Sequence, residues 1–350
     1  MTIKAQYKNY KKKIVVFMIM MLVVLSCVII MSLGVGSSNV GFYDGFKLVF
    51  NNTPTNTQQI ILNIRLPRVI AAVVCGWALA FSGCVMQVVL RNSLASPYTL
   101  GLSNAAAFGA GIVIVFLGAG QSIPTSGDLP FVTSPYLVAI GAFLSSMIAL
   151  GTILLISKRL KGSPQTIILA GIIISSLFGA ALDAIQYLSS TSQLASIIFW
   201  TFGNLGNSTW TALAINSAVI IPITLLMYYQ RWNYRAVSAG DENAISLGVN
   251  PVKTRIIALT MATLCTSVVV SFFGVIAFIS LVVPHMMRKV VGSNEEFLLP
   301  SSAICGALFL LICDTLSRTI FAPIVIPVGI ITSLVGAPIF LMLLFKMKKS

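Results

Sequence analysis

Hydrophobic and polar positions alternate along this chain in long blocks. Apolar runs of about 20 residues, the length at which an α-helix crosses the hydrocarbon core of a bilayer, are separated by short polar stretches. Ten such runs can be delimited, at 14–34, 67–90, 99–118, 136–157, 165–188, 211–230, 256–273, 275–291, 297–313 and 327–345. The pattern predicts an all-α polytopic membrane protein with about ten transmembrane helices, built as a single transmembrane domain over residues 1–350.

Composition supports this class and excludes others. Apolar residues make up 57% of the 350 residues and charged ones 9%, which is far from the composition of a soluble domain. The formal net charge of +14 would suit a nucleic-acid partner, but the basic residues lie between the apolar runs, where the positive-inside rule places them. We therefore predict contact with membrane lipid and no nucleic-acid partner.

The distribution of Lys and Arg predicts the orientation. An even number of spans puts both termini on one side. With that side cytoplasmic, four of the 22 basic residues lie outside, namely Lys47, Arg65, Arg68 and Arg318. The run at 14–34 is too long for the core of a signal peptide, so we expect it to be retained as the first span. The expected location is the cytoplasmic membrane, multi-pass, with the N- and C-termini in the cytoplasm.

The longest charged segment, residues 231–255, lies between the sixth and seventh spans. Within it, Gly240 to Gly248 reads as a short helix, because Asp241 and Glu242 suit the positive end of a helix dipole and Gly248 is a typical stop. The apolar residues of this helix are Ala244, Ile245 and Leu247. Two interpretations remain open: a docking handle whose apolar residues enter a groove in a partner, or an ordinary loop lying on lipid headgroups.

The arginines on the outer side run against the topogenic preference, so something is expected to offset them. One explanation is structural, because Asp314 and Arg318 are four residues apart and can pair on one helix face. The other is a basic rim that receives an acidic partner or an anionic solute. We favour the rim for Arg65 and Arg68, because no acid lies near them in sequence.

Polar residues within the spans are few. Asp183 is the one acid clearly inside an apolar run, and an intramembrane acid is a functional candidate. It either lines the mouth of a water-filled cavity or is a hydrogen-bonded structural residue. For His285, local hydrogen bonding at a kinked helix end is favoured over a role as haem ligand. Small residues at Gly76, Ala80 and Gly83 predict close helix packing.

Motifs for metal and nucleotide chemistry are absent from the sequence. The six cysteines all lie inside apolar runs without the paired spacing of a metal site, so we predict no metal ligands and no cofactor in this chain. No phosphate-binding loop of the Gly-x-x-x-x-Gly-Lys-Ser/Thr type occurs. Any nucleotide chemistry is therefore expected on another chain, and this one is not predicted to be an enzyme.

Several further motifs together resemble the FecCD family of iron-chelate and cobalamin uptake permeases. They follow the family's order over residues 60–340: Arg65-Leu-Pro-Arg68, Ala80-x-Ser-Gly-Cys-Val-Met-Gln87, Leu90-Arg-Asn-Ser-Leu-Ala-Ser-Pro97, Ile198-Phe-Trp-Thr-Phe-Gly203, Ala244-x-x-Leu247-Gly248, Val283-Pro-His-Met-Met-Arg288 and Asp314-Thr-Leu-Ser-Arg318. Most members have Arg-Asn-Pro-Leu-Ala-x-Pro in the third stretch, and Ser93 stands in place of that proline.

The resemblance implies the architecture of a type II ABC importer permease. Two permeases, identical or paralogous, would form a central pathway. Two separate ABC ATPase subunits would bind below, carrying the ATP and magnesium, and an extracytoplasmic binding protein would deliver the cargo. The cargo implied first is a ferric siderophore, with haem or cobalamin as the alternative. A stand-alone secondary transporter is the competing class, although the scarcity of buried acids counts against it.

The resemblance also implies roles for residues that match its motifs. Coupling to the ATPase falls to the loop 231–255, at Asp241, Glu242, Ala244, Leu247 and Gly248. Docking of the binding protein falls to Arg65, Arg68 and Arg318. The gate and pathway residues are Asn92, Ser93, Leu94, Gly162, Ser163 and, on the fifth span, Asp183. The fifth and tenth spans are expected to line the pathway.

Overall fold

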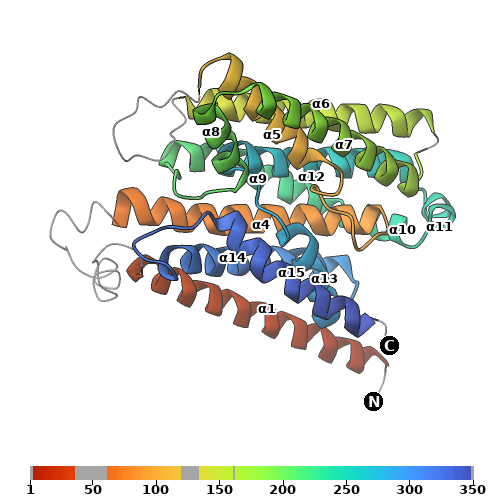
Figure 1. Cartoon of the computed structure of the whole chain (residues 1–350). Coiled ribbons are helices and arrows are strands. Elements are labelled where there is room, and N and C mark those ends of the chain that lie inside the picture. The colour runs from red at the N-terminus through yellow and green to blue at the C-terminus, as the bar shows by residue number, and fades with distance from the viewer. Residues whose placement is uncertain (1–2, 36–60, 120–133, 161, 348–350) are drawn as a thin grey trace.

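The computed structural model describes residues 3–35, 61–119, 134–160 and 162–347 (Figure 1). Its elements are α1 (Ile3–Gly34), the π-helical turn η1 (Ile61–Arg65), α4 (Leu66–Val89), α5 (Leu102–Phe116), α6 (Pro135–Arg159), α7 (Pro164–Leu188), α8 (Thr191–Thr201), α9 (Trp210–Tyr229), α10 (Arg231–Ser238), α11 (Asp241–Ser246), α12 (Pro251–Phe273), α13 (Ile279–Val291), α14 (Glu295–Thr319) and α15 (Val328–Met347). No strand occurs in these ranges. The all-α prediction is confirmed.

A helix lies on each of the ten predicted spans. Among the described residues, seven helices are long and apolar enough to cross a membrane, namely α1, α4 with its preceding turn, α6, α7, α9, α12 and α14. Of the other three, α5 and α15 include shorter apolar stretches, and α13 has only 13 residues. The sequence pattern does not predict α8 and α10 as helices, because α8 follows α7 after a two-residue break and α10 is short and charged.

α13 begins later than the apolar run suggested, because the backbone unwinds between α12 and α13. Gly274 has φ +72° and Phe278 has φ +67°, values that interrupt a right-handed helix. The unwound link 274–278 packs tightly on the end of α8, where a Cβ on Gly203 would lie 2.3 Å from the Val275 carbonyl oxygen. Irregular backbone at membrane depth is tolerated where protein surrounds it, and this link meets that condition.

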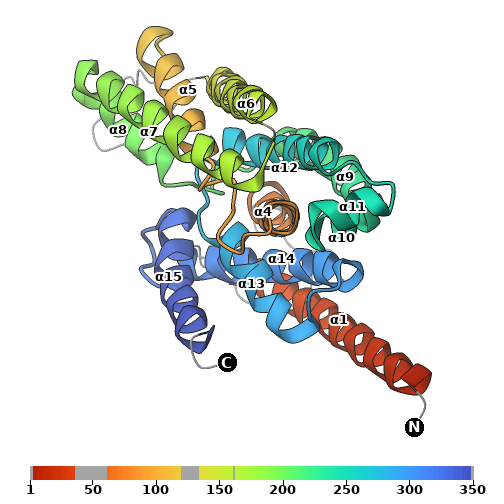
Figure 2. The same ribbon diagram turned by 90° about the vertical axis from the view of Figure 1, so that its right-hand side faces the viewer.

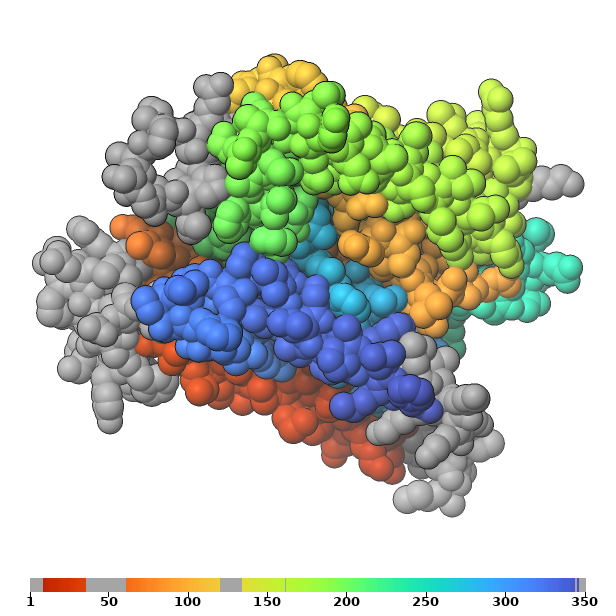
Figure 3. All heavy atoms as spheres, viewed as in Figure 1, coloured from red at the N-terminus to blue at the C-terminus, as the bar shows by residue number. Residues whose placement is uncertain are grey.

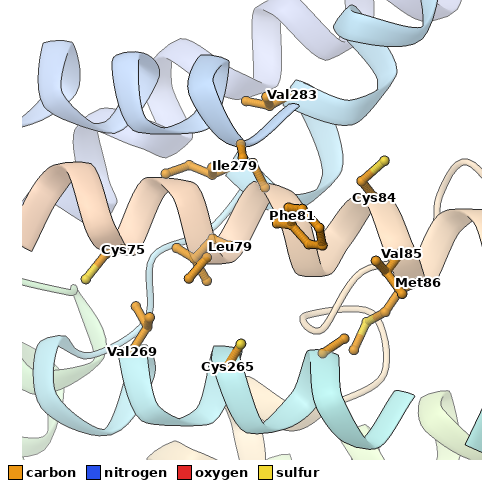
Figure 4. Close-up of a cluster of buried hydrophobic side chains, with 14 of the residues drawn as sticks. Cys75, Leu79, Phe81, Cys84, Val85, Met86, Cys265, Val269, Ile279 and Val283 are labelled. Carbon is orange, nitrogen blue, oxygen red and sulfur yellow. The ribbon is translucent and has the colours of Figure 1, made fainter. Parts of the chain in front are cut away.

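The central helix of the bundle is α4. Figure 2 shows it nearly end-on, with α9, α10, α12, α13 and α14 around it. Most of its residues are buried, as expected for a helix that is apolar on all sides. The close-up in Figure 4 shows Leu79, Phe81 and Met86 of α4 in the same buried cluster as Val269 of α12 and Ile279 of α13. Movement of α4 would therefore be felt by most of the molecule.

Small residues let the neighbours of α4 approach its backbone. A Cβ added to Gly76 would lie 2.3 Å from the carbonyl oxygen of Gly306 on α14, and one added to Gly83 would lie 1.9 Å from that of Ser280 on α13. Real Cβ atoms do not approach oxygen so closely. The close packing predicted from Gly76, Ala80 and Gly83 is confirmed.

Gly76→Val is expected to lower the thermal stability of the protein. Overpacking a core costs about 1–3 kcal/mol, and here the added methyls meet a backbone carbonyl that cannot rotate away. Gly151→Ala on α6 is the matched control, because nothing lies within 4 Å of a Cβ at that position, and it should be neutral or slightly stabilising. Melting of the detergent-purified proteins measures both, and identical melting of Gly76→Val and its parent would contradict the packing argument.

The start of α1 and the end of α15 lie at the same end of the bundle as α10 and α11 (Figure 1). This agrees with an even number of crossings and with a shared side for the termini and the loop 231–255. Which side of the membrane this is remains a prediction from the basic residues.

Candidate functional site

Residues 231–248, which comprise α10, α11 and the turn that ends α11, form a projection that we name the α10–α11 handle (Figure 1). The short helix predicted at 240–248 is present but begins at Asp241 and ends at Ser246. It is flanked by Gly240 with φ +118° and Gly248 with φ +77°, backbone conformations that glycine adopts readily. Gly248 therefore has the helix-ending geometry that its position suggested.

The apolar residues of the handle divide into an inner and an outer set. Ala244 is 0% exposed and packs with Ala236 and Val237 of α10 in a small separate core. Ile245 and Leu247 are 63% and 69% exposed. Ala244 is therefore not exposed as an apolar anchor: it faces α10, a helix that the sequence pattern does not predict. Its role in coupling stays a prediction. The exposed apolar pair is Ile245 and Leu247, of which only Leu247 was predicted to couple to the ATPase.

Asp241 points into the molecule. Arg255 of α12 donates two hydrogen bonds to its carboxylate, one from Nη1 at 2.8 Å and one from Nη2. Arg91 lies 3.4 Å from the same carboxylate. Glu242, by contrast, is exposed. Asp241 and Glu242, which are neighbours at the start of the helix, thus have different surroundings. The sequence pattern does not predict Arg255 as the partner of Asp241.

The electrostatics keep Asp241 ionised. The hydrogen bond from Arg255 holds the pKa of the Asp241 carboxyl below its ordinary value, burial opposes this, and the charges of Arg255 and Arg91 add to the lowering. Because the folded-state pKa is lowered, the stabilisation is present above the unfolded value of about 3.9 and is lost as pH falls through the lowered pKa. The contacts of Asp241 are thus intact throughout the neutral range.

The first candidate gate loop follows α4 directly. Asn92 accepts a hydrogen bond on Oδ1 from the backbone N–H of Leu94 at 2.8 Å, a local turn typical of asparagine. Ser93 is half-buried and Leu94 is 50% exposed. Arg91 has φ +48°, so the chain reverses at the point where its side chain reaches Asp241. No contact of the Ser93 side chain explains the departure from the family's proline.

The second candidate gate loop precedes α7. Gly162 has φ +65°, and its N–H donates to the carbonyl of Ser157 at 2.8 Å. Ser163 caps α7 by accepting from the N–H of Thr166. A Cβ on Gly162 would lie 3.0 Å from Val252 at the start of α12. The structure thus brings both gate loops to the handle or to the helix that follows it.

The arginines of the outer end are buried, which corrects the expectation of an exposed rim. Arg68 donates from Nε to Asp314 Oδ1 at 2.8 Å, and Arg318 donates from Nε to Asp314 Oδ2 at 3.1 Å. Arg318 also donates to Ser32 Oγ at 2.7 Å, and Arg65 donates to the Leu33 carbonyl at 2.8 Å. The acid that offsets Arg68 is distant in sequence but adjacent in space, and the predicted Asp314–Arg318 pair is present. A docking role for these residues stays a prediction.

The face of α7 that carries Asp183 is uncovered in the single chain. Its exposed residues recur at helical spacing, namely Leu169, Ile172, Ile173, Ser176, Leu177, Ala180, Asp183, Ala184 and Tyr187. Asp183 makes no hydrogen bond or ion pair with the described residues. Figure 3 shows α7 and α15 on either side of a hollow in the molecular surface, with the segment that follows α4 between them. A carboxylate is costly against lipid, so this face requires water or another protein surface.

His285 differs from its predicted role. Its side chain is 6% exposed, and neither ring nitrogen has a hydrogen-bond partner among the described residues. The ring packs edge-on against Phe340 of α15, with 6.2 Å between the ring centroids. The expected local hydrogen bonding is therefore not observed. No group of three or more potential metal ligands occurs within the described ranges.

The described residues thus form a bundle of helices, seven of them long and apolar enough to cross a membrane, with the handle and the two gate loops at one end (Figure 1). The chain belongs to the FecCD transport family, which matches it over residues 21–346. The resemblance seen in the motifs is thereby confirmed.

Relatives extend this result over the whole chain. A putative ABC transporter permease protein of Methanocaldococcus jannaschii is 45% identical over 100% of this chain and 99% of its own length. A hemin transport system permease protein of Yersinia pestis is 38% identical over 92% of this chain and 94% of its own. A solved structure, described as an inward-facing conformation of a putative metal-chelate type ABC transporter, has a TM-score of 0.82 and 29% identity, covering 94% of this chain and 99% of that one. The chain is therefore a multi-pass membrane protein and a permease of an ABC transporter.

Proposed function

We propose that this chain moves a ferric siderophore across the cytoplasmic membrane, as one of two permeases driven by two ATPase subunits that carry ATP and magnesium. An extracytoplasmic binding protein supplies the cargo, and both termini of the chain are cytoplasmic. The observation that carries the proposal is the exposure of Ile245 and Leu247 on a handle that is folded around its own core. Exposed apolar anchors on a rigid support suit insertion into a groove of a partner protein.

The uncovered face of α7 supports a second permease copy or paralogue. An apolar stripe that carries Asp183 is costly against lipid, because it exposes a carboxylate to hydrocarbon. A second permease chain would cover the apolar residues and enclose a water-filled pathway in which the carboxylate stays hydrated. The hollow between α7 and α15 (Figure 3) lies where such a path would run. The described pathway residues offer little charge to bind the cargo, which suits a chelate whose metal is already coordinated.

The substrate alternatives are haem and cobalamin, and the competing mechanism is transport by this chain alone along an ion gradient. The hemin transport name of one relative and the metal-chelate description of the solved structure support a chelated metal. They do not choose among the chelates, because the binding protein that selects the cargo is another chain.

The test is reconstitution in liposomes of this permease with its ATPase and binding protein, given a panel of ferric siderophores, haem and labelled cobalamin. We expect uptake of one ferric siderophore that requires ATP inside the compartment facing the handle and requires the binding protein outside. Uptake of haem or cobalamin instead would replace the cargo but keep the mechanism. Uptake by the permease alone, driven by a proton or sodium gradient, would overturn the proposal.

A further inference from the structure

The carboxylate of Asp241 connects the handle to the residues around the end of α4. Arg255, on the first turns of α12, binds Asp241 of the handle with two guanidinium nitrogens. With its third nitrogen, Nε, it donates to the carbonyl of Val89 at 3.0 Å. Val89 is the last residue of α4, so its carbonyl has no partner within that helix. The guanidinium thus connects the handle with the end of the central helix.

Arg91 makes a second connection to the same carboxylate. It lies two residues after Val89, at the start of the first gate loop, and its Nη2 is 3.4 Å from Asp241 Oδ1. Its left-handed backbone turns the side chain back toward the handle. Asp241 is therefore connected through Arg255 to the last residue of α4 and through Arg91 to the start of the gate loop.

The burial of Arg255 distinguishes this link from an ordinary surface ion pair. Its side chain is 1% exposed, whereas that of Asp241 is 37% exposed. A planar guanidinium held at three donors has a fixed orientation, and a buried one has no water with which to exchange its partners. When Asp241 moves, Arg255 must move with it or leave a buried donor unsatisfied, which is costly.

The handle has contacts of its own besides this link. Ala236, Val237 and Ala244 form its own small core. A separate hydrogen bond, from Ser238 Oγ to Glu295 Oε1 at 3.1 Å, attaches it to the start of α14. The Asp241–Arg255 link is thus additional to the contacts that shape and seat the handle, and it leads toward the gate loop.

We propose that Asp241 and Arg255 are positioning residues that transmit displacement of the α10–α11 handle to the end of α4 and to the gate loop at residues 91–95. This inference rests on the proposed function, since it concerns how work done by the ATPase reaches the pathway. It assigns Asp241 a role inside the permease, while Ile245 and Leu247 face the ATPase.

The test measures ATP hydrolysis and transport separately in the reconstituted complex. Asp241→Asn and Arg255→Gln are expected to keep the ATPase bound and to hydrolyse ATP within about twofold of the parent, while the cargo moved per ATP falls about tenfold. The double variant should be no worse than either single one, because both remove the same contact. Arg255→Lys, which keeps the charge but not three fixed donors, should lie between Arg255→Gln and the parent.

Lys253→Gln is the matched control, because it removes a positive charge two residues from Arg255 on an exposed side chain, and it should behave as the parent. Should Asp241→Asn fail to accumulate, Asp241→Glu keeps the charge but alters the reach, and the same loss of cargo per ATP is expected. Unchanged cargo per ATP in the link variants overturns the inference, and so does loss of ATPase binding in step with transport. Absence of ATP-driven uptake in the parent would instead overturn the proposed function.

Discussion

Leu247→Asp is expected to abolish ATP-driven uptake while the permease still inserts in the membrane. Leu247 is 69% exposed on the handle, so a charge there does not disturb the fold of this chain. In a complex, the carboxylate would be buried in an apolar groove without a partner, and the loss of a buried anchor typically costs 2 kcal/mol or more, roughly thirtyfold in affinity. Co-purification of the ATPase and uptake of cargo are the two measurements.

A graded series separates docking from general damage at this end of the protein. Leu247→Ala removes area without adding charge and should weaken ATPase binding less than Leu247→Asp. Ile245→Asp should match Leu247→Asp, because Ile245 is 63% exposed beside it. Val290→Asp places the same charge on a 55% exposed residue outside the handle and should leave ATPase binding intact. Full uptake by Leu247→Asp would show that the handle is not the docking element.

Among single substitutions of polar or charged residues in this chain, Asp314→Asn is expected to lower the stability of the protein most. Asp314 is 0% exposed and accepts hydrogen bonds from both Arg68 and Arg318. Removing one partner of a buried ion pair costs about 3–5 kcal/mol, a large part of the total stability of a typical protein. Here the change leaves two buried guanidinium groups facing each other without an acid.

The three members of this cluster should differ in a fixed order. Arg68→Met leaves Asp314 paired with Arg318 and should be the mildest. Arg318→Met should be worse, because it also frees Ser32 and the Val35 carbonyl on the α1 side. Adding Arg68→Met to Asp314→Asn should recover part of the stability, since one unpaired charge is removed. Heating followed by gel filtration ranks the variants, and parent-like melting of Asp314→Asn would contradict the account.

The spans could be predicted from the sequence because membrane crossing depends on local properties of the chain, namely length and apolar character. Where a helix or its boundary could not be predicted, the reason was a contact between residues that are not neighbours in the sequence. The apolar run that starts at 275 has the sequence pattern of a helix. In the structure, the unwound link 274–278 packs against Gly203, and Gly203 is too distant in the sequence for a local pattern to include it. Likewise, α10 is too short and charged to be visible as a helix until its packing with Ala244 is known.

Which residues belong to the candidate site could be predicted from the sequence, but which way their side chains face could not. The motif around Ala244 and Leu247 located the handle, but which of the two faces outward depends on α10. Arg68 and Asp314 are far apart in the chain, and their pairing follows from the packing of α4 on α14. The pairing of Asp241 with Arg255 could not be predicted either, since in the sequence both residues are simply charges of one polar loop.

The brevity of α13 bears on how the protein is made. A helix of 13 residues measures about 20 Å at 1.5 Å per residue, well short of the roughly 30 Å hydrocarbon core. Such a segment, with Arg288 and Lys289 in its last turn, has little tendency to partition into lipid by itself during synthesis. It packs against α4, which is synthesised much earlier, and against α14 and α15, which follow it in the chain. Membrane insertion of the C-terminal third therefore depends on packing against helices that are already in place. A defect in α4 would be expected to appear first as a permease whose C-terminal helices fail to insert.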